Sequence, residues 1–439
     1  MSNSGTQMLE TAQHLISSVG KQLHLSDTAI QKLIKPDHIH EADLEVTMDD
    51  GSMRTFKAYR VQHNNVLGPY KGGIRYHPQV SRDEVQALAT LMSIKCSVAG
   101  LPLGGGKGGI VVDPKQLSIT ELERLSRAWV RAFFEFIGEE KDIPAPDVNT
   151  NPQIMSWMID EYIRLKSTAN GKPSNVDQKQ LSKWSGTFTG KPVELGGSLG
   201  RTEATGRGGV ISLKALLEKL PMSWTENKRP TIAVQGFGNV GYFFAKIASE
   251  EGFDVVAVSD SKGGIVYRNM EPLDIPLVMN CKKEKGTLSG CYCAGGVCDL
   301  RGGKPISNED LLELPVDVLV PAALENVVHE GNMTKIQAKV IVELANGPVT
   351  EEAHKHLVKQ GVYVIPDVFA NSGGVTVSYL EWKQNLASET WTEEQVNAEL
   401  LRTMTEAFDA IWKQHAKEKS SLKEAAFQVA VQRLLTSRN

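Results

Sequence analysis

The spacing of apolar residues divides the first part of the chain into stretches of different character. Over about the first forty residues, apolar side chains such as Leu9, Ile16 and Val19 recur at helical spacing and predict helices with one buried face. Between Ala42 and Val61 the pattern alternates in LEVTM and TFKAYRV, and the intervening DDGS is typical of a hairpin turn. We therefore expect two helices followed by an antiparallel pair of strands.

Helical and glycine-rich segments follow one another in the next hundred residues. A helix of about twenty residues is expected from Asp83, and amphipathic stretches at 119–139 and 152–166 predict two more. Glycine-rich segments around Lys71 and at 104–109 are expected to form binding loops beside regular elements, the second leading into a strand at 110–112. DIPAPDVNTN, which carries Asp147, is too rich in proline to be helical.

Short apolar runs alternate with helical stretches in the second half of the chain. TIAVQGFG, DVVAVSD, VDVLVPAA, KVIVELAN and VYVIPD each read as a buried strand, and this alternation predicts an α/β fold with a doubly wound parallel sheet. From about residue 371 the chain reads as helix to its end. Since 439 residues exceed what one core usually supports, we expect two domains: 1–200, completed by helices 371–439, and 201–370.

Composition and charge narrow the classes of function. Hydrophobic residues at 41% and charged residues at 23% are typical of a globular protein. A net charge of −4 offers no global positive field, so we expect no nucleic acid and no membrane as a partner. The first residues lack the pattern of a signal peptide and no run reaches the length of a membrane span, which favours a cytoplasmic location.

Four of the five cysteines, Cys281, Cys291, Cys293 and Cys298, lie in one glycine-rich stretch. A metal site or a disulfide is the alternative to a plain reduced loop. The spacing matches no common zinc site, and disulfides are rare in a reducing cytosol. We therefore expect no metal and a reduced surface loop.

The segment AVQGFGNVG has the form of a dinucleotide-binding turn. It places Gly236, Gly238 and Gly241, with Asn239 and Val240 between them, after a buried strand and at the start of a helix. In that context the first glycine permits the tight turn, the second lets the backbone approach a pyrophosphate, and the helix N-terminus supplies free N–H groups. The alternative is a glycine turn that serves only packing.

Asp260 favours the dinucleotide interpretation, because it lies 22 residues beyond Gly238 at the end of DVVAVSD, where a carboxylate would meet the adenosine ribose hydroxyls. If the glycine turn served only packing, Asp260 would have no function at this position. The choice between NAD and NADP is open: Asp260 would repel a 2′-phosphate, whereas Lys262 could attract one. We favour NAD slightly.

Three lysines stand among glycines or small residues: Lys71 in GPYKGGIR, Lys95 in SIKCSVAG and Lys107 in LPLGGGKGG. GGGKGG lacks the GxxxxGK[ST] frame of a phosphate loop, which disfavours a nucleotide triphosphatase. A lone lysine is most often a solvated surface residue. Glycine around each of them costs backbone entropy, and we attribute it to close approach of a ligand.

The stretch LPLGGGKGGIVVDP resembles the signature of the glutamate/leucine/phenylalanine/valine dehydrogenase family. The similarity runs through GPYKGGIRYHP, PAPDVNTN, TEATGRGG, GFGNVG, PAALEN and ELANGP to NSGGVTVSYLEW, in that order. The resemblance implies an NAD(P)-dependent oxidoreductase of amino-acid metabolism. Residues 1–200 would then form a substrate-binding and oligomerisation domain, 201–370 the dinucleotide domain, and the protein a homohexamer.

The resemblance also implies roles for single residues. Lys107 matches the catalytic lysine of the family, Lys95 the lysine that binds the substrate α-carboxylate, and Asp147 the aspartate that shuttles protons at the reacting nitrogen. Residues matching the nicotinamide end of the cofactor site are Thr205, Asn239 and Asn346. The segment from Cys281 to Cys298 matches no family motif and inherits no role.

The chemistry of amino-acid oxidation fits these residue types. Hydride loss from Cα, proton loss from nitrogen and attack of water need a base poised near neutrality. Burial and neighbouring cations lower the pKa of a lysine enough for that role, and its protonated form can stabilise an oxyanion. Lys107 is therefore a credible activator of water, and Asp147 can exchange the nitrogen proton.

The substrate depends on what meets the end of its side chain. Lys71 and Ser378 match the pair that holds a γ-carboxylate in glutamate dehydrogenases, where relatives acting on leucine, valine or phenylalanine carry apolar residues. We therefore predict interconversion of L-glutamate with 2-oxoglutarate and ammonium, including ammonium assimilation. The alternatives are a dehydrogenase for apolar amino acids and a catalytically silent regulatory homologue.

Overall fold

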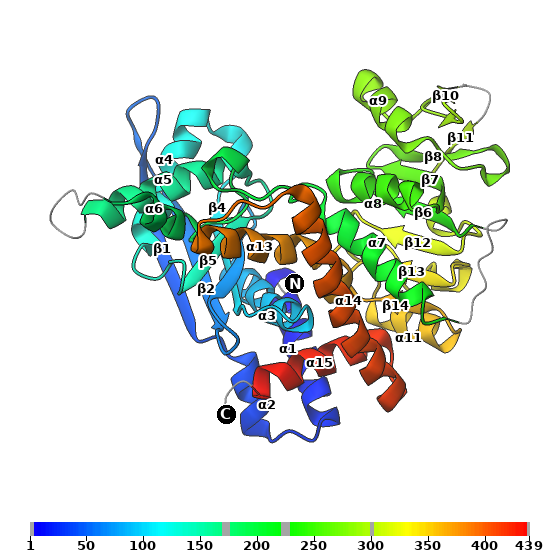
Figure 1. Cartoon of the computed structure of the whole chain (residues 1–439), viewed down its shortest axis with the longest axis horizontal. Helices are drawn as coiled ribbons and strands as arrows, with labels where there is room; N and C mark the ends of the chain where they lie inside the picture. The colour runs from blue at the N-terminus through cyan, green and yellow to red at the C-terminus, as the bar shows by residue number, and fades with distance from the viewer. Residues whose placement is uncertain (1–3, 169–175, 221–228, 299–302, 437–439) are drawn as a thin grey trace. The chain divides into compact units, whose positions relative to one another are not determined.

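The computed structural model of the chain describes residues 4–168, 176–220, 229–298 and 303–436. These residues form two compact units (Figure 1). The first unit consists of Met1–Arg201, Val375–Glu399 and Phe427–Asn439, and the second of Thr202–Gly374 and Leu400–Ala426.

The first unit is built on a mixed five-stranded sheet. Its strands, in spatial order, are β1 (His38–Thr47), β2 (Met53–Asn64), β4 (Gly105–Val111), β3 (Tyr70–His77) and β5 (Asp142–Pro146). β1 and β2 pair antiparallel with Leu44 opposite Phe56, which confirms the predicted hairpin. β3 runs parallel to both of its neighbours, β4 and β5.

The two glycine-rich segments that were expected to be loops are strands β3 and β4. A Cβ added at Gly72 would lie 1.6 Å from the carbonyl oxygen of Gly106, and one at Gly105 would lie 2.3 Å from the backbone nitrogen of Ser93. These glycines therefore permit close approach of protein backbone. The interpretation that they make room for a ligand was wrong at these positions.

Helices cover both faces of this sheet. The helices of the first unit, or reaching into it, are α1 (Ser4–Gln22), α2 (Asp27–Ile34), α3 (Arg82–Val98), α4 (Ile119–Phe133), α5 (Pro152–Thr168), α6 (Gln178–Ser185), α13 (Gly373–Ala387), α14 (Glu393–Glu418) and α15 (Leu422–Thr436). On β2, Ala58 belongs to the core that includes α4 and α5, whereas Val61 packs with Val85 and Ala89 of α3. Because alternate residues of a strand face opposite sides, α3 lies on one face and α4 with α5 on the other.

Local sequence explains where these helices begin. Ser81 accepts a hydrogen bond from the backbone N–H of Glu84 at the start of α3. At the start of α4, Ser118 and Glu121 form a reciprocal capping box. Both helices thus begin at residues whose side chains satisfy otherwise unpaired backbone donors.

The second unit contains a seven-stranded sheet. Its strands, in spatial order, are β11 (Gly303–Ile306), β8 (Gly263–Tyr267), β7 (Asp254–Asp260), β6 (Thr231–Gln235), β12 (Val318–Pro321), β13 (Val340–Val342) and β14 (Tyr363–Ile365). The five neighbouring strands β7, β6, β12, β13 and β14 are parallel, which confirms the predicted doubly wound sheet. β8 and β11 add an antiparallel edge beside β7. The chain order reverses at β6, so a binding crevice is expected at the carboxyl ends of β6 and β12.

The helices of the second unit connect these strands. They are α7 (Ala204–Leu217), α8 (Asn239–Glu250), α9 (Ile275–Lys285), α10 (Asn308–Leu312), α11 (Glu351–Lys359) and α12 (Asp367–Ala370). Short 3₁₀ turns occur at Pro114–Gln116, Val193–Leu195, Arg268–Met270 and Met333–Lys335. A two-stranded ribbon, β9 (Cys293–Ala294) with β10 (Val297–Cys298), follows α9.

The predicted boundaries placed all of the C-terminal helices, 371–439, in the first unit. In the structure, part of these helices belongs to the second unit. From Leu400 onward, α14 (Glu393–Glu418) belongs to the second unit. The ring of Phe408 lies 5.8 Å from that of Phe369, and Trp412 lies 6.4 Å from Tyr363. The sequence showed that this helix has an apolar stripe, but it did not show which surface the stripe covers.

A disulfide joins Cys281 of α9 to Cys291, with the two Cα atoms 5.6 Å apart. The expectation of a reduced loop was therefore wrong. A left-handed turn at Gly286 ends α9 and lets the following residues fold back, so two cysteines ten positions apart come within bonding distance. Within the described ranges, no group of three or more His, Cys, Asp or Glu side chains is arranged to hold a metal ion.

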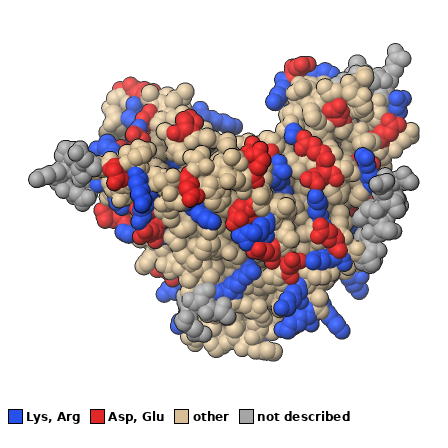
Figure 2. All heavy atoms as spheres, in the orientation of Figure 1, with Lys and Arg blue, Asp and Glu red and all other residues tan. Residues whose placement is uncertain are grey.

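The described helices include none with the length and apolar character needed to cross a bilayer. On the face drawn in Figure 2, basic and acidic side chains alternate over the surface. This distribution agrees with the near balance of 48 basic and 52 acidic residues.

Candidate active site

Lys107 and Asp147 form a hydrogen-bonded ion pair in the first unit. Lys107 lies on β4 and is 6% exposed, and Asp147 directly follows β5. β3 runs between these two strands, and its Gly73 leaves room for the aspartate: a Cβ at Gly73 would lie 2.7 Å from the Cβ of Asp147. The missing side chain of Gly73 therefore allows the pair to form across β3.

Charges around the pair set its protonation. Burial lowers the pKa of Lys107, and the nearby Arg75 cation acts in the same direction, while Asp147 opposes them. Burial alone would raise the pKa of Asp147, but the charges of Lys107 and Arg75 outweigh it and lower that pKa. Arg75 Nε donates to Asp147 Oδ1 at 2.9 Å. Asp147 is thus an anion between two cations, beside a lysine that loses its proton more readily than usual.

Lys71 is buried near the start of β3, with 1% of its surface exposed. Its Nζ donates to Thr189 Oγ1 at 2.7 Å and to the carbonyl oxygen of Ile143 at 3.2 Å. Burial lowers the pKa of Lys71 to about 7, with Arg201 also lowering it and Glu381 raising it. Lys71 is a desolvated cation for which an added carboxylate would be a favourable partner.

A buried ion pair supports the strand that carries Lys71. Arg60 donates through Nε to Asp142 Oδ2 at 2.8 Å and through Nη1 to the carbonyl oxygen of Gly72 at 3.1 Å. Gln62 donates to the same carboxylate at 2.9 Å. These bonds connect β2, β3 and β5 beneath the site.

Ser378 lies on α13 and is 2% exposed, and its Oγ accepts a hydrogen bond from Arg201 Nε at 3.2 Å. One turn further along the helix, Glu381 forms a buried ion pair with Lys191 at 2.7 Å and accepts from the backbone N–H of Gly190 at 2.8 Å. α13 therefore presents the serine and also fixes the segment next to Thr189, which is the partner of Lys71.

Lys95 is half-buried on α3, near the end of that helix. It lies one residue before Cys96. Burial raises the pKa of the Cys96 thiol to about 12, and the charges of Lys71 and Lys95 partly oppose this increase. Lys95 thus acts on the same buried group as Lys71, and its assignment to the substrate α-carboxylate stays a prediction.

The glycine turn of the second unit fits a pyrophosphate. Gly236 has a left-handed φ of +99°, and a Cβ at Gly241 would lie 1.8 Å from the carbonyl oxygen of Gly236. A Cβ at Gly238, by contrast, would have no atom within 4 Å. No side chain caps the start of α8, which is 12 residues long. The turn therefore leaves open space in front of a helix N-terminus, as a bound dinucleotide requires.

Asp260 lies at the end of β7 and is held by two donors. Its Oδ2 pairs with Lys282 Nζ at 2.8 Å, and its Oδ1 accepts from the backbone N–H of Lys262 at 2.9 Å. Lys282 also donates to the carbonyl oxygen of Phe237 in the glycine turn at 3.0 Å. The ammonium of Lys262 instead donates to the carbonyl oxygen of Gly286. The cation beside the predicted ribose carboxylate is thus Lys282.

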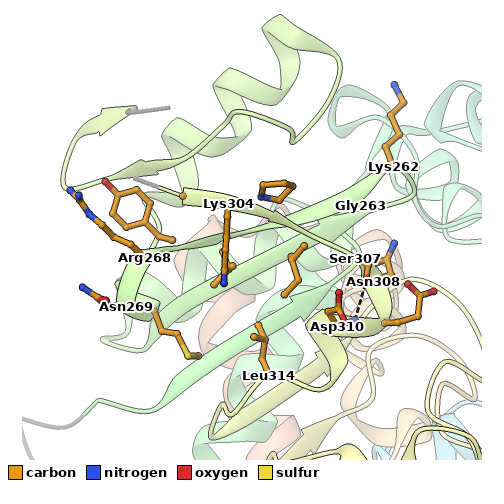
Figure 3. Close-up of a pocket in the computed structure, with 16 residues that line it drawn as sticks. Lys262, Gly263, Arg268, Asn269, Lys304, Ser307, Asn308, Asp310 and Leu314 are labelled. Carbon is orange, nitrogen blue, oxygen red and sulfur yellow. Dashed lines mark hydrogen bonds between the residues drawn. The ribbon is translucent and has the colours of Figure 1, made fainter. Parts of the chain in front are cut away.

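A cavity of 1180 Å³ lies at the antiparallel edge of the second sheet, where residues of β8, β11 and α10 line it (Figure 3). Figure 3 shows Lys262 pointing away from Ser307, Asn308 and Asp310. Among the residues that the sequence singled out, the lining contains Lys262, which was weighed as a partner for a 2′-phosphate, and none of those expected to bind substrate or to take part in catalysis.

The residues expected at the nicotinamide end all lie in the second unit. Thr205 is half-buried in the first turn of α7. Asn239 is exposed at the start of α8 and donates to the carbonyl oxygen of Thr202 at 2.8 Å. Asn346 is exposed, and its Oδ1 accepts from Asn371 at 3.0 Å. Asn239 and Asn346 are thus each held by a hydrogen bond.

Sequence reasoning missed several residues in these clusters. Arg75, Thr189, Arg201 and Lys282 each contact a predicted site residue directly. Arg75 and Arg201 adjoin glycine-rich segments in GPYKGGIR and SLGRTEATGRGG, which was an available signal. Thr189 and Lys282 carried no local signal, because long-range folding brings them to their partners.

Two family models match the chain. The model of the Glu/Leu/Phe/Val dehydrogenase dimerisation domain matches residues 36–164, and that of Glutamate/Leucine/Phenylalanine/Valine dehydrogenase matches residues 196–439. The chain belongs to this family. Every predicted site residue lies within one of these two matched ranges.

Several Glu/Leu/Phe/Val dehydrogenases are similar over almost their full length. The NADP-specific glutamate dehydrogenase of Synechocystis sp. is 44% identical over 414 residues, covering 94% of this chain and 92% of that protein. The NAD-specific glutamate dehydrogenase of Clostridioides difficile is 42% identical over 437 residues, covering 99% and 98%. Among solved structures, the Leu-bound hetero-hexameric glutamate dehydrogenase of Thermus thermophilus has a TM-score of 0.85 at 33% identity, covering 98% and 96%. Relatives of both cofactor specificities thus occur.

Proposed function

We propose roles for single residues in the reaction of this chain, which is an NAD(P)-dependent glutamate dehydrogenase. The enzyme converts L-glutamate to 2-oxoglutarate and ammonium by oxidative deamination and catalyses the reverse reductive amination. The observation that carries the assignment of roles is the buried pair of Lys107 and Asp147, in which a lysine with a lowered pKa contacts a carboxylate.

Lys107 acts as base and then as acid. When bound, the nicotinamide supplies an acceptor for the hydride that leaves Cα of glutamate. The neutral amine of Lys107 takes a proton from the water that attacks the resulting substrate iminium carbon. The ammonium formed in this way stabilises the oxygen of the carbinolamine and gives its proton to the departing amine nitrogen. The neutral amine of Lys107 then takes up the hydroxyl proton as the C–N bond breaks and the C=O bond forms. The lowered pKa of Lys107 supports this role, because it increases the neutral fraction near neutral pH.

Asp147 exchanges the proton of the substrate nitrogen. Its lowered pKa keeps it an anion, which favours a positively charged nitrogen nearby. While it is paired with the Lys107 ammonium it is a weak proton acceptor, and deprotonation of Lys107 makes it stronger. The two residues therefore act in sequence, with Arg75 holding the carboxylate in place.

Lys71 and Ser378 select the γ-carboxylate of glutamate, and Lys95 holds the α-carboxylate. A desolvated carboxylate without partners costs several kcal/mol, so the side chain of glutamate needs cations and hydroxyl donors. Lys71 with Thr189 and Ser378 with Arg201 supply both kinds of group. The side chain of an apolar amino acid would offer the buried ammonium of Lys71 no negative charge and no acceptor.

In the second unit, we assign Gly236, Gly238, Val240 and Gly241 to the pyrophosphate and Asp260 to the adenosine ribose. The residues assigned to the nicotinamide end are Thr205, Asn239 and Asn346. The open space at Gly238 and the uncapped start of α8 support the first assignment.

NAD is the slightly favoured cofactor, because Asp260 supplies an acceptor for ribose hydroxyls and a repulsive charge for a 2′-phosphate. Lys282 reduces that repulsion, since it pairs with Asp260 at 2.8 Å. Steady-state kinetics with both cofactors test this balance: Lys282→Gln should lower kcat/KM for NADP more than for NAD. Equal effects would remove Lys282 from the choice.

We propose a homohexamer assembled through the first unit. The match of residues 36–164 to a dimerisation domain supports oligomerisation, and the Thermus thermophilus relative is a hetero-hexamer. Light scattering should give a mass six times that of the 48.0 kDa chain. A cytoplasmic location and a part in ammonium assimilation stay predictions.

Steady-state assays of the purified protein test the function directly. Glutamate should give 2-oxoglutarate, ammonium and reduced cofactor in equal amounts, with kcat/KM well above the values for leucine, valine and phenylalanine. A preference for an apolar amino acid would contradict the roles of Lys71 and Ser378. No turnover with any amino acid would favour a catalytically silent homologue.

A further inference from the structure

The segment 345–348, which carries Asn346, is held by a carboxylate that the roles above do not use. The backbone N–H of Gly347 donates to Asp367 Oδ2 at 2.9 Å, and Gly347 has a left-handed φ of +56°. On its other side, the carbonyl oxygen of Gly347 accepts from the backbone N–H of Asn326 at 2.9 Å. The residue next to Asn346 is therefore fixed through both of its backbone polar groups.

Both oxygens of Asp367 are used for backbone donors. Asp367 is the first residue of α12, and its Oδ1 accepts from the N–H of Val368 at 2.7 Å while Oδ2 accepts from Gly347. An amide in place of this carboxylate would turn an NH₂ group toward one of these N–H donors. The bond to Gly347 thus depends on a carboxylate at this position.

Glu343 fixes Asp367 in turn. It directly follows β13, is 2% exposed, and its Oε2 accepts from the backbone N–H of Asp367 at 2.9 Å. Burial raises the pKa of Glu343 to about 8, with the Asp367 charge also raising it and Lys423 lowering it. A carboxyl that is largely neutral near pH 7 still accepts this bond, so Glu343 joins the end of β13 to the start of α12.

Asn371 completes the arrangement. Its Nδ2 donates to Asn346 Oδ1 at 3.0 Å and to the carbonyl oxygen of Leu344 at 3.3 Å. Because oxygen and nitrogen lie on opposite sides of an amide, this contact directs the nitrogen of Asn346 away from Asn371. A directed N–H donor matches the carbonyl oxygen of a carboxamide.

We infer that Asp367 and Glu343 are positioning residues that hold Asn346 in place for the nicotinamide carboxamide. The inference rests on the proposed role of Asn346. It predicts that loss of Asp367 harms recognition of the nicotinamide ring and leaves recognition of the rest of the dinucleotide intact, because the two backbone donors that Asp367 holds belong to Gly347 and Val368 and neither belongs to the glycine turn at Gly236–Gly241.

Binding measurements on the full protein with two probes test this prediction. ADP-ribose contains the pyrophosphate and the adenosine but lacks the nicotinamide ring, whereas NADH contains all three. In Asp367→Asn, Kd for NADH should rise about three- to tenfold, the scale of a weakened hydrogen bond, while Kd for ADP-ribose should change less than about twofold. Glu343→Gln should stay close to the unaltered protein, because its amide oxygen can accept from Asp367, and Glu343→Ala should resemble Asp367→Asn.

Asp317→Asn is the matched control. Asp317 Oδ2 also accepts from a backbone N–H, that of Thr231 at 3.1 Å, but it lies before β12, at the opposite end of the parallel strands. This variant should lower Tm and leave the ratio of the two Kd values unchanged. Asn371→Ala offers a second route to the same ratio if Asp367→Asn does not fold.

An unchanged ratio of the Kd values for NADH and ADP-ribose in both Asp367→Asn and Asn371→Ala would overturn the inference. An equal change in Asp317→Asn would also overturn it, because a general loss of stability would then explain the effect. Failure of the unaltered protein to bind either NADH or NADPH would instead contradict the proposed function.

Discussion

Replacing Lys71 with leucine and Ser378 with valine should remove the preference for glutamate. Lys71 is buried and donates to Thr189 at 2.7 Å, and Ser378 is buried beside Arg201 at 3.2 Å. The double variant would leave a γ-carboxylate facing an apolar wall, with Thr189 and Arg201 as its remaining partners.

The expected size of the effect follows from the two lost contacts. Both contacts are hydrogen bonds to a charged carboxylate, and the loss of each costs about 1.5–3 kcal/mol. Since about 1.4 kcal/mol corresponds to a factor of ten, kcat/KM for glutamate should fall by about a hundredfold or more. Norleucine has a side chain of similar length without a charge, so its kcat/KM should fall far less or increase.

Steady-state kinetics with glutamate and norleucine at saturating cofactor measure both values, and the KM of the cofactor should hardly change. The single variants separate the two contributions, and Lys71→Leu should account for most of the loss. Equal losses for glutamate and norleucine would refute the reasoning, because Lys71 and Ser378 would then support the fold and not the choice of substrate.

Two further predictions follow from groups in the first and second units. Because burial brings the pKa of Lys71 to about 7, this residue is charged in the free enzyme below that pH and neutral above it. The ratio of kcat/KM for glutamate to that for norleucine should therefore fall as pH rises through 7, and pH profiles should show a flat ratio in Lys71→Leu. Replacing Cys281 and Cys291 with serine should lower the free energy of unfolding by about 2–3 kcal/mol in urea titrations. A dithiol should also lower the stability of the unaltered protein; equal stability of the variant and the unaltered protein without dithiol would show that the Cys281–Cys291 bond does not contribute.

The fold was predictable from the sequence wherever local pattern and long-range packing agree. Alternation around the DDGS turn predicted the hairpin of β1 and β2, and the apolar runs predicted the parallel sheet of the second unit. The glycine-rich strands β3 and β4 were not predictable in this way, because glycine disfavours strands by itself. Only contact with neighbouring backbone, such as that of Gly72 with Gly106, explains their composition.

The site was predictable in its residue types but not in its partners. Glycine-rich context and the family resemblance singled out Lys107, Asp147 and Lys71, and the structure places the first two in direct contact. Thr189 and Lys282 were missed, because each meets its partner across a long stretch of chain. A local pattern records which side chains are available, whereas the pairing of distant ones depends on the packed sheet.

The cysteine pair shows the same limit. The bond between Cys281 and Cys291 requires the left-handed turn at Gly286, which brings the chain back toward α9. Glycine after a helix was a visible signal for such a turn. Spacing alone excluded a common zinc site but could not decide between two thiols and a disulfide.

The most direct test of the account is steady-state turnover of glutamate by Lys107→Ala, followed by the release of ammonium together with the appearance of reduced cofactor. Lys107 is 6% exposed and contacts Asp147, whereas Lys57, a half-exposed lysine on β2, serves as the control for the same substitution. Lys107→Ala should retain its Kd for the cofactor and lose at least about a hundredfold in turnover, the usual scale for an acid–base group, and Asp147→Asn should behave similarly. Lys57→Ala should turn over at the rate of the unaltered enzyme. Turnover in Lys107→Ala within a few-fold of that control would contradict the central claim that this lysine carries out the acid–base chemistry.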